Sequence, residues 1–379
     1  MTHGMYVYPW DLEEEGASAV LPRLRDIGID AISLAVSYHA GKFVRPHAPQ
    51  RRVYFPEDGT IYFPPDMSRY GLIKPLPNSR VGVYDPLREL ARHGSDFRVT
   101  AWTVGLHNTP LGVAHPSLVV RNCFGDPLWN SLCPSAPDVR AYLVALCADL
   151  AANQPLAEIA IETPGWQAFR HGHHHEFELI DLTPRAQILL GMCFCDSCLA
   201  AASAAGIEGD ALRRRTVVEL EQFFTDGTEP ATDPGTDADW RAFHALRAAT
   251  VTSLVTEVRA AMPQAVGLAV VPSTQSPNSL CWIEGSDLAA LAKLCRLEVP
   301  AYQLGVAAIL ADAAEVRAAA GAEATIGYIL RPTYPHLLSA ADVRSAVKGL
   351  EAAGANGLAF YNYGHMRLSS LDWIAAALA

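Results

Sequence analysis

Glu162 is the first residue whose type and setting could do chemistry. It ends an apolar run, residues 156–162, and the Thr-Pro-Gly-Trp that follows turns the chain away from that run. A carboxyl group partly removed from water has a raised pKa, which suits a general acid that protonates a leaving oxygen. A structural ion pair is the alternative role for such a residue, and the choice depends on where the run ends in the fold.

Three cysteines have the spacing of a metal site. They lie in the segment Cys193-Phe-Cys195-Asp-Ser-Cys198, and thiolates at this spacing can converge on one tetrahedral ion. A fourth ligand must come from elsewhere, and Cys133, in Leu-Cys-Pro-Ser, is a better candidate than Cys123. An ion held by four cysteines is closed to substrate, so we expect a structural zinc. Three reduced, buried thiols are the alternative.

A run of histidines separates Glu162 from these cysteines. Residues 170–176 read Arg-His-Gly-His-His-His-Glu, which brings His171, His173, His174 and His175 into one short segment. Imidazoles so concentrated can bind a catalytic divalent metal or face a polar substrate. The alternative is a polar loop whose histidines compete with one another.

The scaffold for these residues is indicated by an alternation of short apolar runs with amphipathic segments rich in Ala, Leu and Arg. Such alternation is typical of parallel α/β folds. Strands are predicted at 5–10, 31–36, 97–104, 156–162, 265–271, 297–302, 325–330 and 357–361. The clearest helices are predicted at 14–27, 137–152, 240–262, 286–294, 309–320 and 339–353. Eight such units close a barrel, so we expect an α/β fold, a single (β/α)8 TIM barrel over residues 1–379. An open doubly wound sheet is the alternative, but no Gly-rich dinucleotide fingerprint follows the first strand.

Two insertions interrupt the alternation. Residues 40–80 are rich in Pro, Tyr and Arg, and a β-hairpin is predicted over 53–63 with its turn at Asp58-Gly59. Residues 163–239 form a His- and Cys-rich excursion after strand four. Both insertions follow the carboxyl ends of strands, which is the face where barrels build their active sites.

Polar and aromatic residues recur at the predicted strand ends. Aromatic rings stack on sugar faces, and Asn, His and Arg read hydroxyls or carboxylates. Any one of these residues could be a packing or capping residue, so their recurrence carries the argument. Substrate contacts are expected from Trp10, Tyr38, His39, His107, Asn108, Trp166, His171, His173, His174, Gln275, Tyr302, Arg331, Tyr334, Tyr361, Asn362 and His365.

Segments on either side of Glu162 resemble family 42 β-galactosidases and related glycoside hydrolases. They are residues 115–126 (HPSLVVRNCFGD), residues 132–142 (LCPSAPDVRAY) and residues 193–198 (CFCDSC), and the similarity covers roughly residues 97–200. The resemblance implies a barrel enzyme in which Glu162 is the acid/base. It also implies a structural zinc on Cys133, Cys193, Cys195 and Cys198.

The chain departs from that family at two positions. The family has Asn before its acid/base, where this chain has Ile161, and a Glu nucleophile ending strand seven, where this chain has Arg331. A second catalytic carboxylate must then come from another position. The candidates are Glu298 on strand six, then Asp11 after strand one, then Glu176 in the His-rich run.

These patterns together predict a glycoside hydrolase acting on a small glycoside or glycoconjugate, with no organic cofactor. One alternative is a metal-dependent hydrolase, lyase or isomerase that uses the histidines of residues 171–175. A non-catalytic sugar-binding barrel is the other, because strand seven lacks its carboxylate.

The composition of the chain limits the classes of partner that the protein is expected to bind. The net charge of −11 disfavours nucleic acid, and no run of 18 apolar residues predicts a membrane span. The amino terminus lacks the features of a signal peptide, so a cytoplasmic location with reduced cysteines is expected. The sequence is compatible with both a monomer and a homo-oligomer.

Overall fold

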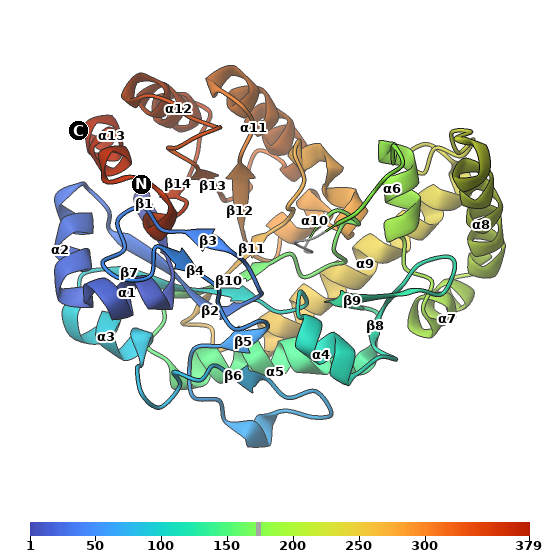
Figure 1. Cartoon of the computed structure of the whole chain (residues 1–379), viewed down its shortest axis with the longest axis horizontal. Helices are drawn as coiled ribbons and strands as arrows, with labels where there is room; N and C mark the ends of the chain where they lie inside the picture. Colours follow the sequence, from blue (N-terminus) through green and yellow to red (C-terminus); the bar gives the residue numbers. More distant parts are fainter. Residues whose placement is uncertain (172–175) are drawn as a thin grey trace.

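The structure, a computed structural model that describes residues 1–171 and 176–379, is built around a closed barrel of parallel strands (Figure 1). β1 pairs with both β2 and β14, which closes the sheet. The predicted (β/α)8 barrel is therefore confirmed. Its strands are β1 (Thr2–Val7), β2 (Ala31–Tyr38), β7 (Arg98–Val104), β10 (Glu158–Glu162), β11 (Gly267–Val271), β12 (Arg296–Ala301), β13 (Ile326–Leu330) and β14 (Gly357–Phe360).

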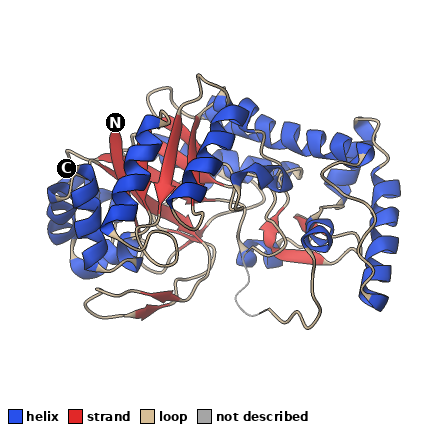
Figure 2. Cartoon of the chain, turned by 90° about the horizontal axis from the view of Figure 1, so that it is seen from above, coloured by secondary structure: helices blue, strands red, loops and turns tan. Residues whose placement is uncertain are grey.

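Helices cover the outside of the barrel (Figure 2). Strands buried on both faces read as continuous apolar runs, and β2 is buried along its whole length. The helices that follow the strands are α1 (Pro9–Glu15), α2 (Ala17–Asp26), α3 (Pro86–His93), α4 (Thr109–Ala114), α5 (Pro137–Asn153), α9 (Ala238–Ala261), α10 (Leu288–Ala292), α11 (Val306–Ala320), α12 (Ala340–Ala352) and α13 (Leu368–Leu378). Short 3-10 helices are η1 (Met67–Arg69), η2 (Asn278–Glu284) and η3 (Tyr363–His365).

The first strand ends earlier than predicted. It stops at Val7, because Pro9 occupies the first turn of α1, a position where proline is favoured. Trp10 and Asp11 therefore lie in a helix and not at a strand end. The helix predicted over 14–27 is also broken at Gly16, whose φ of 85° separates α1 from α2.

The insertion after β2 pairs differently from the predicted hairpin. β4 (Val53–Tyr54) pairs with β3 (Phe43–Val44), whereas β5 (Thr60–Ile61) pairs with β2 and with β6 (Leu76–Pro77). Gly59, with a φ of 65°, does supply the expected turn. The strands on its two sides join different sheets because β2 extends far enough to accept β5 as a neighbour.

The excursion after β10 builds a second apolar cluster beside the barrel (Figure 1). It contains α6 (Pro184–Gly191), α7 (Asp196–Ala204) and α8 (Gly209–Asp226), and α9 leads back to β11. The hairpin of β8 (Val119–Arg121) and β9 (Pro127–Leu132) reaches this excursion, since the backbone N–H of Phe194 donates to the carbonyl of Arg121 at 2.7 Å.

Within the described residues no single helix is long and apolar enough to cross a membrane, and α6 with α7 meet that criterion only as a pair bent by 89°.

Candidate active site

The carboxyl ends of the barrel strands surround a cavity of about 420 Å³. Much of its wall is aromatic, and a mostly apolar lining with a few polar groups is typical of small-molecule sites. The aromatic lining comes from Tyr6, Tyr38, Trp102, Tyr302 and Tyr361, and polar groups come from His39, Glu162, His171, Thr274, Arg331 and His336.

Glu162 is the one carboxylate among the described residues that line this cavity. It is partly exposed at the end of β10, and the indole Nε1 of Trp102 donates to its Oε2 at 2.6 Å. Burial raises the pKa of Glu162 from 4.5 to about 7, and the charge of Glu284 acts in the same direction. The bond from Trp102 and the charge of Arg331 lower that pKa and so limit the rise. A large share of these carboxyl groups is therefore protonated near neutral pH.

Arg331 directly follows β13 and brings a positive charge to the cavity. Its guanidinium lies 3.5 Å from the ring centroid of Tyr302 and 5.0 Å from that of Tyr361. Its Nε has no hydrogen-bond partner among the described residues. The position that the resemblance assigns to a nucleophilic carboxylate is thus occupied by a cation that contacts two aromatic rings.

Three phenols form a hydrogen-bonded chain, and two of them, Tyr38 and Tyr361, line the cavity. The hydroxyl of Tyr8 is 2.9 Å from that of Tyr38 and 2.9 Å from that of Tyr361. Burial raises the pKa of Tyr8 and Tyr38 well above 10 and also raises that of Tyr361, so all three phenols stay neutral.

A second carboxylate lies behind the cavity wall. Glu284, at the end of η2, is buried and accepts hydrogen bonds from the backbone N–H of Thr274 at 3.0 Å and from the hydroxyl of Thr274 at 2.5 Å. Sequence reasoning missed it, although a Glu inside the apolar segment Cys-Trp-Ile-Glu-Gly was a usable signal. Glu284 acts on Glu162 through charge, and it does not line the cavity.

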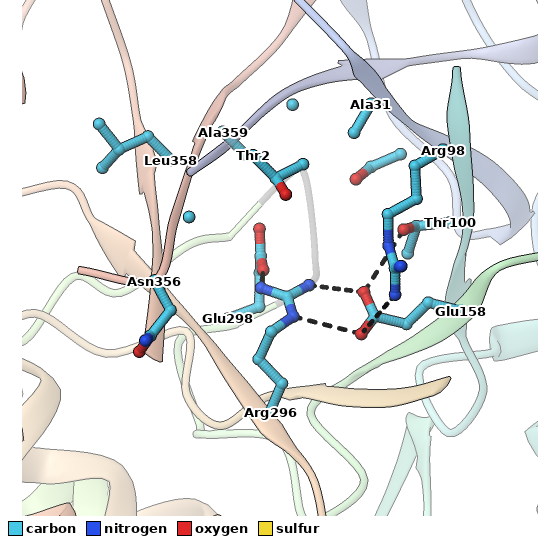
Figure 3. Close-up of a pocket in the computed structure, with 13 residues that line it drawn as sticks. Thr2, Ala31, Arg98, Thr100, Glu158, Arg296, Glu298, Asn356, Leu358 and Ala359 are labelled. Atoms are coloured by element: carbon cyan, nitrogen blue, oxygen red, sulfur yellow. Dashed lines mark hydrogen bonds and ion pairs between the residues drawn. The ribbon is translucent and has the colours of Figure 1, made fainter. Parts of the chain in front are cut away.

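Glu298 lies in a separate pocket, which is lined by the amino-terminal portions of the strands (Figure 3). There Arg296 bridges two carboxylates, pairing with Glu298 and with Glu158, whose Oε2 is 2.7 Å from Nη2 of Arg296. This position leaves Glu298 outside the cavity that contains Glu162, so we do not propose it as a second catalytic carboxylate.

Asp11 is also held away from the cavity. It is fully buried, and Nη2 of Arg45 lies 3.0 Å from its Oδ1. Burial raises the pKa of Asp11 to about 6, against the lowering effect of Arg45. The pair attaches the 40–80 insertion to α1, which is a structural role.

Removal of Asp11 is expected to destabilise the fold. An Asp11→Ala variant leaves the fully buried Arg45 with Glu14 as its remaining carboxylate partner, and breaking a buried pair costs about 3–5 kcal/mol. Urea denaturation measures this loss, and the exposed Asp372→Ala serves as control, with an expected change within about 0.5 kcal/mol. An Asp11→Ala variant as stable as wild type would contradict the structural role.

Three histidines gather at the rim. His39 follows β2, His107 follows β7 and His171 follows β10, yet one ring nitrogen from each lies within 4.8 Å of the others. The rings of His39 and His107 are stacked, with centroids 4.1 Å apart. Of the predicted histidine run, His173, His174 and His175 lie outside the described residues.

Other predicted contacts lie elsewhere. Asn108 and Asn362 are buried caps of α4 and η3, and His365 is packed beside Phe43. Trp10 is stacked on Tyr8, and Gln275 lines a neighbouring pocket. Tyr334 and Glu176 are exposed and line no described pocket near Glu162.

Several residues of the cavity were not predicted from the sequence, including Tyr6, Trp102, Thr274 and His336. Trp102 binds Glu162 directly, and His336 lines the wall near Arg331. Trp102 lies inside a predicted strand, so a period-2 reading of that strand would have placed it on one face. His336 follows strand seven by several residues and carries no comparable signal.

The four cysteines of the predicted metal site are buried together. Sγ of Cys133 lies 3.5 Å from Sγ of Cys195, 3.5 Å from that of Cys198 and 3.8 Å from that of Cys193. Cys123 is not part of this group and packs in the second apolar cluster. Trp166, predicted to contact substrate, instead packs against the four cysteines.

No protein-family model matches the sequence, and no curated protein sequence matches it either. Solved structures do share its fold. The glycoside hydrolase domain of PgaB (BpsB) from Bordetella bronchiseptica aligns with a TM-score of 0.62 and 13% identity, covering 100% of this chain and 99% of that one.

Two galactosidases give similar results. The β-galactosidase of Halorubrum lacusprofundi has a TM-score of 0.58 at 12% identity, and that of Marinomonas ef1 has 0.56 at 11%. Both alignments cover 100% of this chain but only 57% and 59% of the galactosidases, so the chain spans less than two thirds of their length. The expected likeness to glycoside hydrolases is therefore confirmed at the level of the fold.

Proposed function

We propose that this protein is a glycoside hydrolase in which Glu162 is the general acid. The observation that carries the proposal is one carboxyl with a pKa near 7 at the end of the fourth barrel strand, facing an aromatic cavity. A protonated carboxyl in that position can donate to the leaving oxygen of a glycosidic bond at neutral pH. Trp102 holds one carboxyl oxygen in place, which leaves the other for the substrate.

The cavity suits a small glycoside or glycoconjugate. A volume of about 420 Å³ fits one or two sugar rings, and the partly exposed rings of Tyr302 and Tyr361 can contact them. The hydroxyls of Tyr38 and Tyr361 and the guanidinium of Arg331 belong to residues that line the cavity, and such groups can bind hydroxyl or carboxylate oxygens of a sugar.

A panel of aryl and alkyl glycosides, assayed for both turnover and binding, tests the proposal. Hydrolysis of at least one member supports it. Ligand binding without turnover across the panel would favour the sugar-binding barrel, which is supported by the lack of a second carboxylate among the described lining residues.

We further propose that Cys133, Cys193, Cys195 and Cys198 hold a structural zinc ion. Tetrahedral zinc with Zn–S bonds of about 2.3 Å places its sulfur ligands about 3.8 Å apart. The separations of 3.5–3.8 Å measured from Cys133 fit that requirement. The guanidinium of the buried Arg247 lies 4.3 Å from the ring centroid of Trp166. It interacts through charge with three of the four cysteines, so it would offset part of the negative charge of a zinc ion bound to four thiolates. A bound zinc would hold the excursion to the segment after β9.

Arg331 is expected to set the pH range of the reaction. Its charge lowers the pKa of Glu162, so an Arg331→Gln variant removes a cation and raises that pKa. Because the protonated form of Glu162 is the active acid, the alkaline limb of the kcat/KM profile moves to higher pH. The measurement is the pH profile together with 13C NMR titration of the Glu162 carboxyl.

The conservative Arg331→Lys variant keeps a positive charge and is expected to keep the alkaline limb near its wild-type position. An NMR-determined pKa of Glu162 that stays unchanged in Arg331→Gln would show that Arg331 acts only by contacting substrate.

A further inference from the structure

The rim of the cavity carries a ligand set that the proposed hydrolase mechanism does not use. We propose that His39, His107 and His171 form a binding site for one divalent transition-metal ion. The site is distinct from the cysteine site, because it is built from other residues at the ends of other elements.

The three imidazoles come from three separate segments that follow β2, β7 and β10. One ring nitrogen from each lies within 4.8 Å of the other two. His107 is buried and His39 is stacked on it, while the ring of His171 meets that of His107 edge-on with centroids 5.1 Å apart. Three like side chains brought together from such distant positions indicate a shared ligand.

A hydrogen bond orients the ring of His39, and two others hold the backbone of His171. Nδ1 of His39 lies 2.7 Å from the carbonyl oxygen of Ala40, which can only accept, so Nδ1 is the donor in this bond. A backbone carbonyl on the remote ring nitrogen is the usual support of a metal-binding histidine. His171 is fixed through its backbone, since its carbonyl accepts from Nδ2 of Asn130 at 3.0 Å and its N–H donates to Ala168 at 2.9 Å.

The donor set selects the kind of ion. Neutral imidazole favours zinc, cobalt, nickel or copper, whereas calcium and magnesium require several oxygen ligands that this trio lacks. Three protein ligands also leave coordination positions open, unlike the four cysteines. The stacked rings of His39 and His107 cannot both point a lone pair at one ion, so the proposed site requires the ring of His107 to turn about χ2 while His39 keeps its bond to Ala40.

His39 and His171 line the same cavity as Glu162. The open positions of the ion would therefore face the bound substrate, where a Lewis acid can polarise a hydroxyl group or a water molecule. The cavity has no second carboxylate among the described residues, and the cation would supply a charged group there.

Cobalt titration of protein whose cysteine site is filled with zinc tests the proposal. Wild-type protein is expected to take up one further equivalent of Co²⁺, with d–d bands of a nitrogen and oxygen site and no thiolate charge-transfer band. His39→Ala and His171→Ala are expected to weaken that binding by at least about 100-fold, because each removes one of three ligands. Circular dichroism confirms that the variants are folded.

Two controls separate this site from casual binding. His93→Ala removes an exposed histidine on α3 and is expected to bind cobalt as wild type does. A variant with His173, His174 and His175 all changed to Ala is expected to retain the equivalent within about tenfold, since it keeps all three proposed ligands. Wild-type affinity in both His39→Ala and His171→Ala, or loss of the equivalent in the triple variant alone, would overturn the proposal. The experiment needs no glycosidase activity, so its result is independent of the proposed hydrolase function.

Discussion

A Glu162→Gln variant is expected to hydrolyse alkyl glycosides about 10²–10⁴-fold more slowly than wild type, the usual contribution of a positioned general acid. Glutamine keeps the shape of the side chain and an acceptor for the indole of Trp102, but it has no acidic proton to donate. Steady-state kcat/KM, measured on the best substrate from the glycoside panel, gives the size of the loss.

A comparison of substrates with different leaving groups tests the role of Glu162 most directly. Dinitrophenolate departs without protonation, so its glycosides should be affected far less than alkyl glycosides in the same variant. Equal losses for both kinds of substrate would show that Glu162 does not act as the acid. Glu298→Gln is the matched control, because Glu298 lies in the other pocket (Figure 3). This variant is expected to change the stability of the protein and to have little effect on the ratio of the rates for dinitrophenyl and alkyl glycosides.

A Cys198→Ser variant is expected to lose the bound zinc and several kcal/mol of stability. The four thiols are buried close together. Only the folded chain holds its ligands in position for a structural zinc, so the free energy of zinc binding adds to the free energy of unfolding. Metal content by mass spectrometry and thermal unfolding measure the two effects. The expected zinc content falls from about one equivalent to near zero, in line with the loss of one of four ligands.

Cys295→Ser is the control for the zinc experiment. Cys295 is a half-buried thiol outside the cysteine group, so the variant should keep its zinc and most of its stability. A zinc-free wild-type protein with the thermal stability of the metal-loaded form would contradict the structural role. Oxidation of the cysteines must be prevented during the measurement, because a disulfide would also remove zinc ligands and would imitate the effect of the substitution.

The predicted barrel rested on local patterns, and local patterns are what a sequence records well. Apolar runs of strand length, separated by amphipathic segments, predicted all eight barrel strands, with the first ending at Val7, three residues earlier than predicted. That displacement has a local cause in Pro9, which begins a helix where the apolar run continues. The spacing of Cys193, Cys195 and Cys198 likewise predicted a cluster, because ligands so close in sequence need little help from the fold.

Part of the candidate site was also within reach of the sequence. Glu162 is the last residue of its strand, and the carboxyl ends of all barrel strands meet at one face, so its position follows from the fold class. The same argument brought Tyr38, Tyr302, Arg331 and Tyr361 to the cavity.

Only the tertiary structure decided where the other carboxylates lie. Strand periodicity tells which face of a strand a side chain occupies. The height of that side chain along the barrel axis depends on the stagger between strands. In this barrel the stagger places Glu298 beside Arg296 in the other pocket. Asp11 is withdrawn by Arg45, a residue of the insertion that no local pattern links to it. The meeting of His39, His107 and His171 likewise depends on contacts between loops far apart in the chain. Such contacts arise from the packing of the whole molecule, and no short stretch of sequence records them.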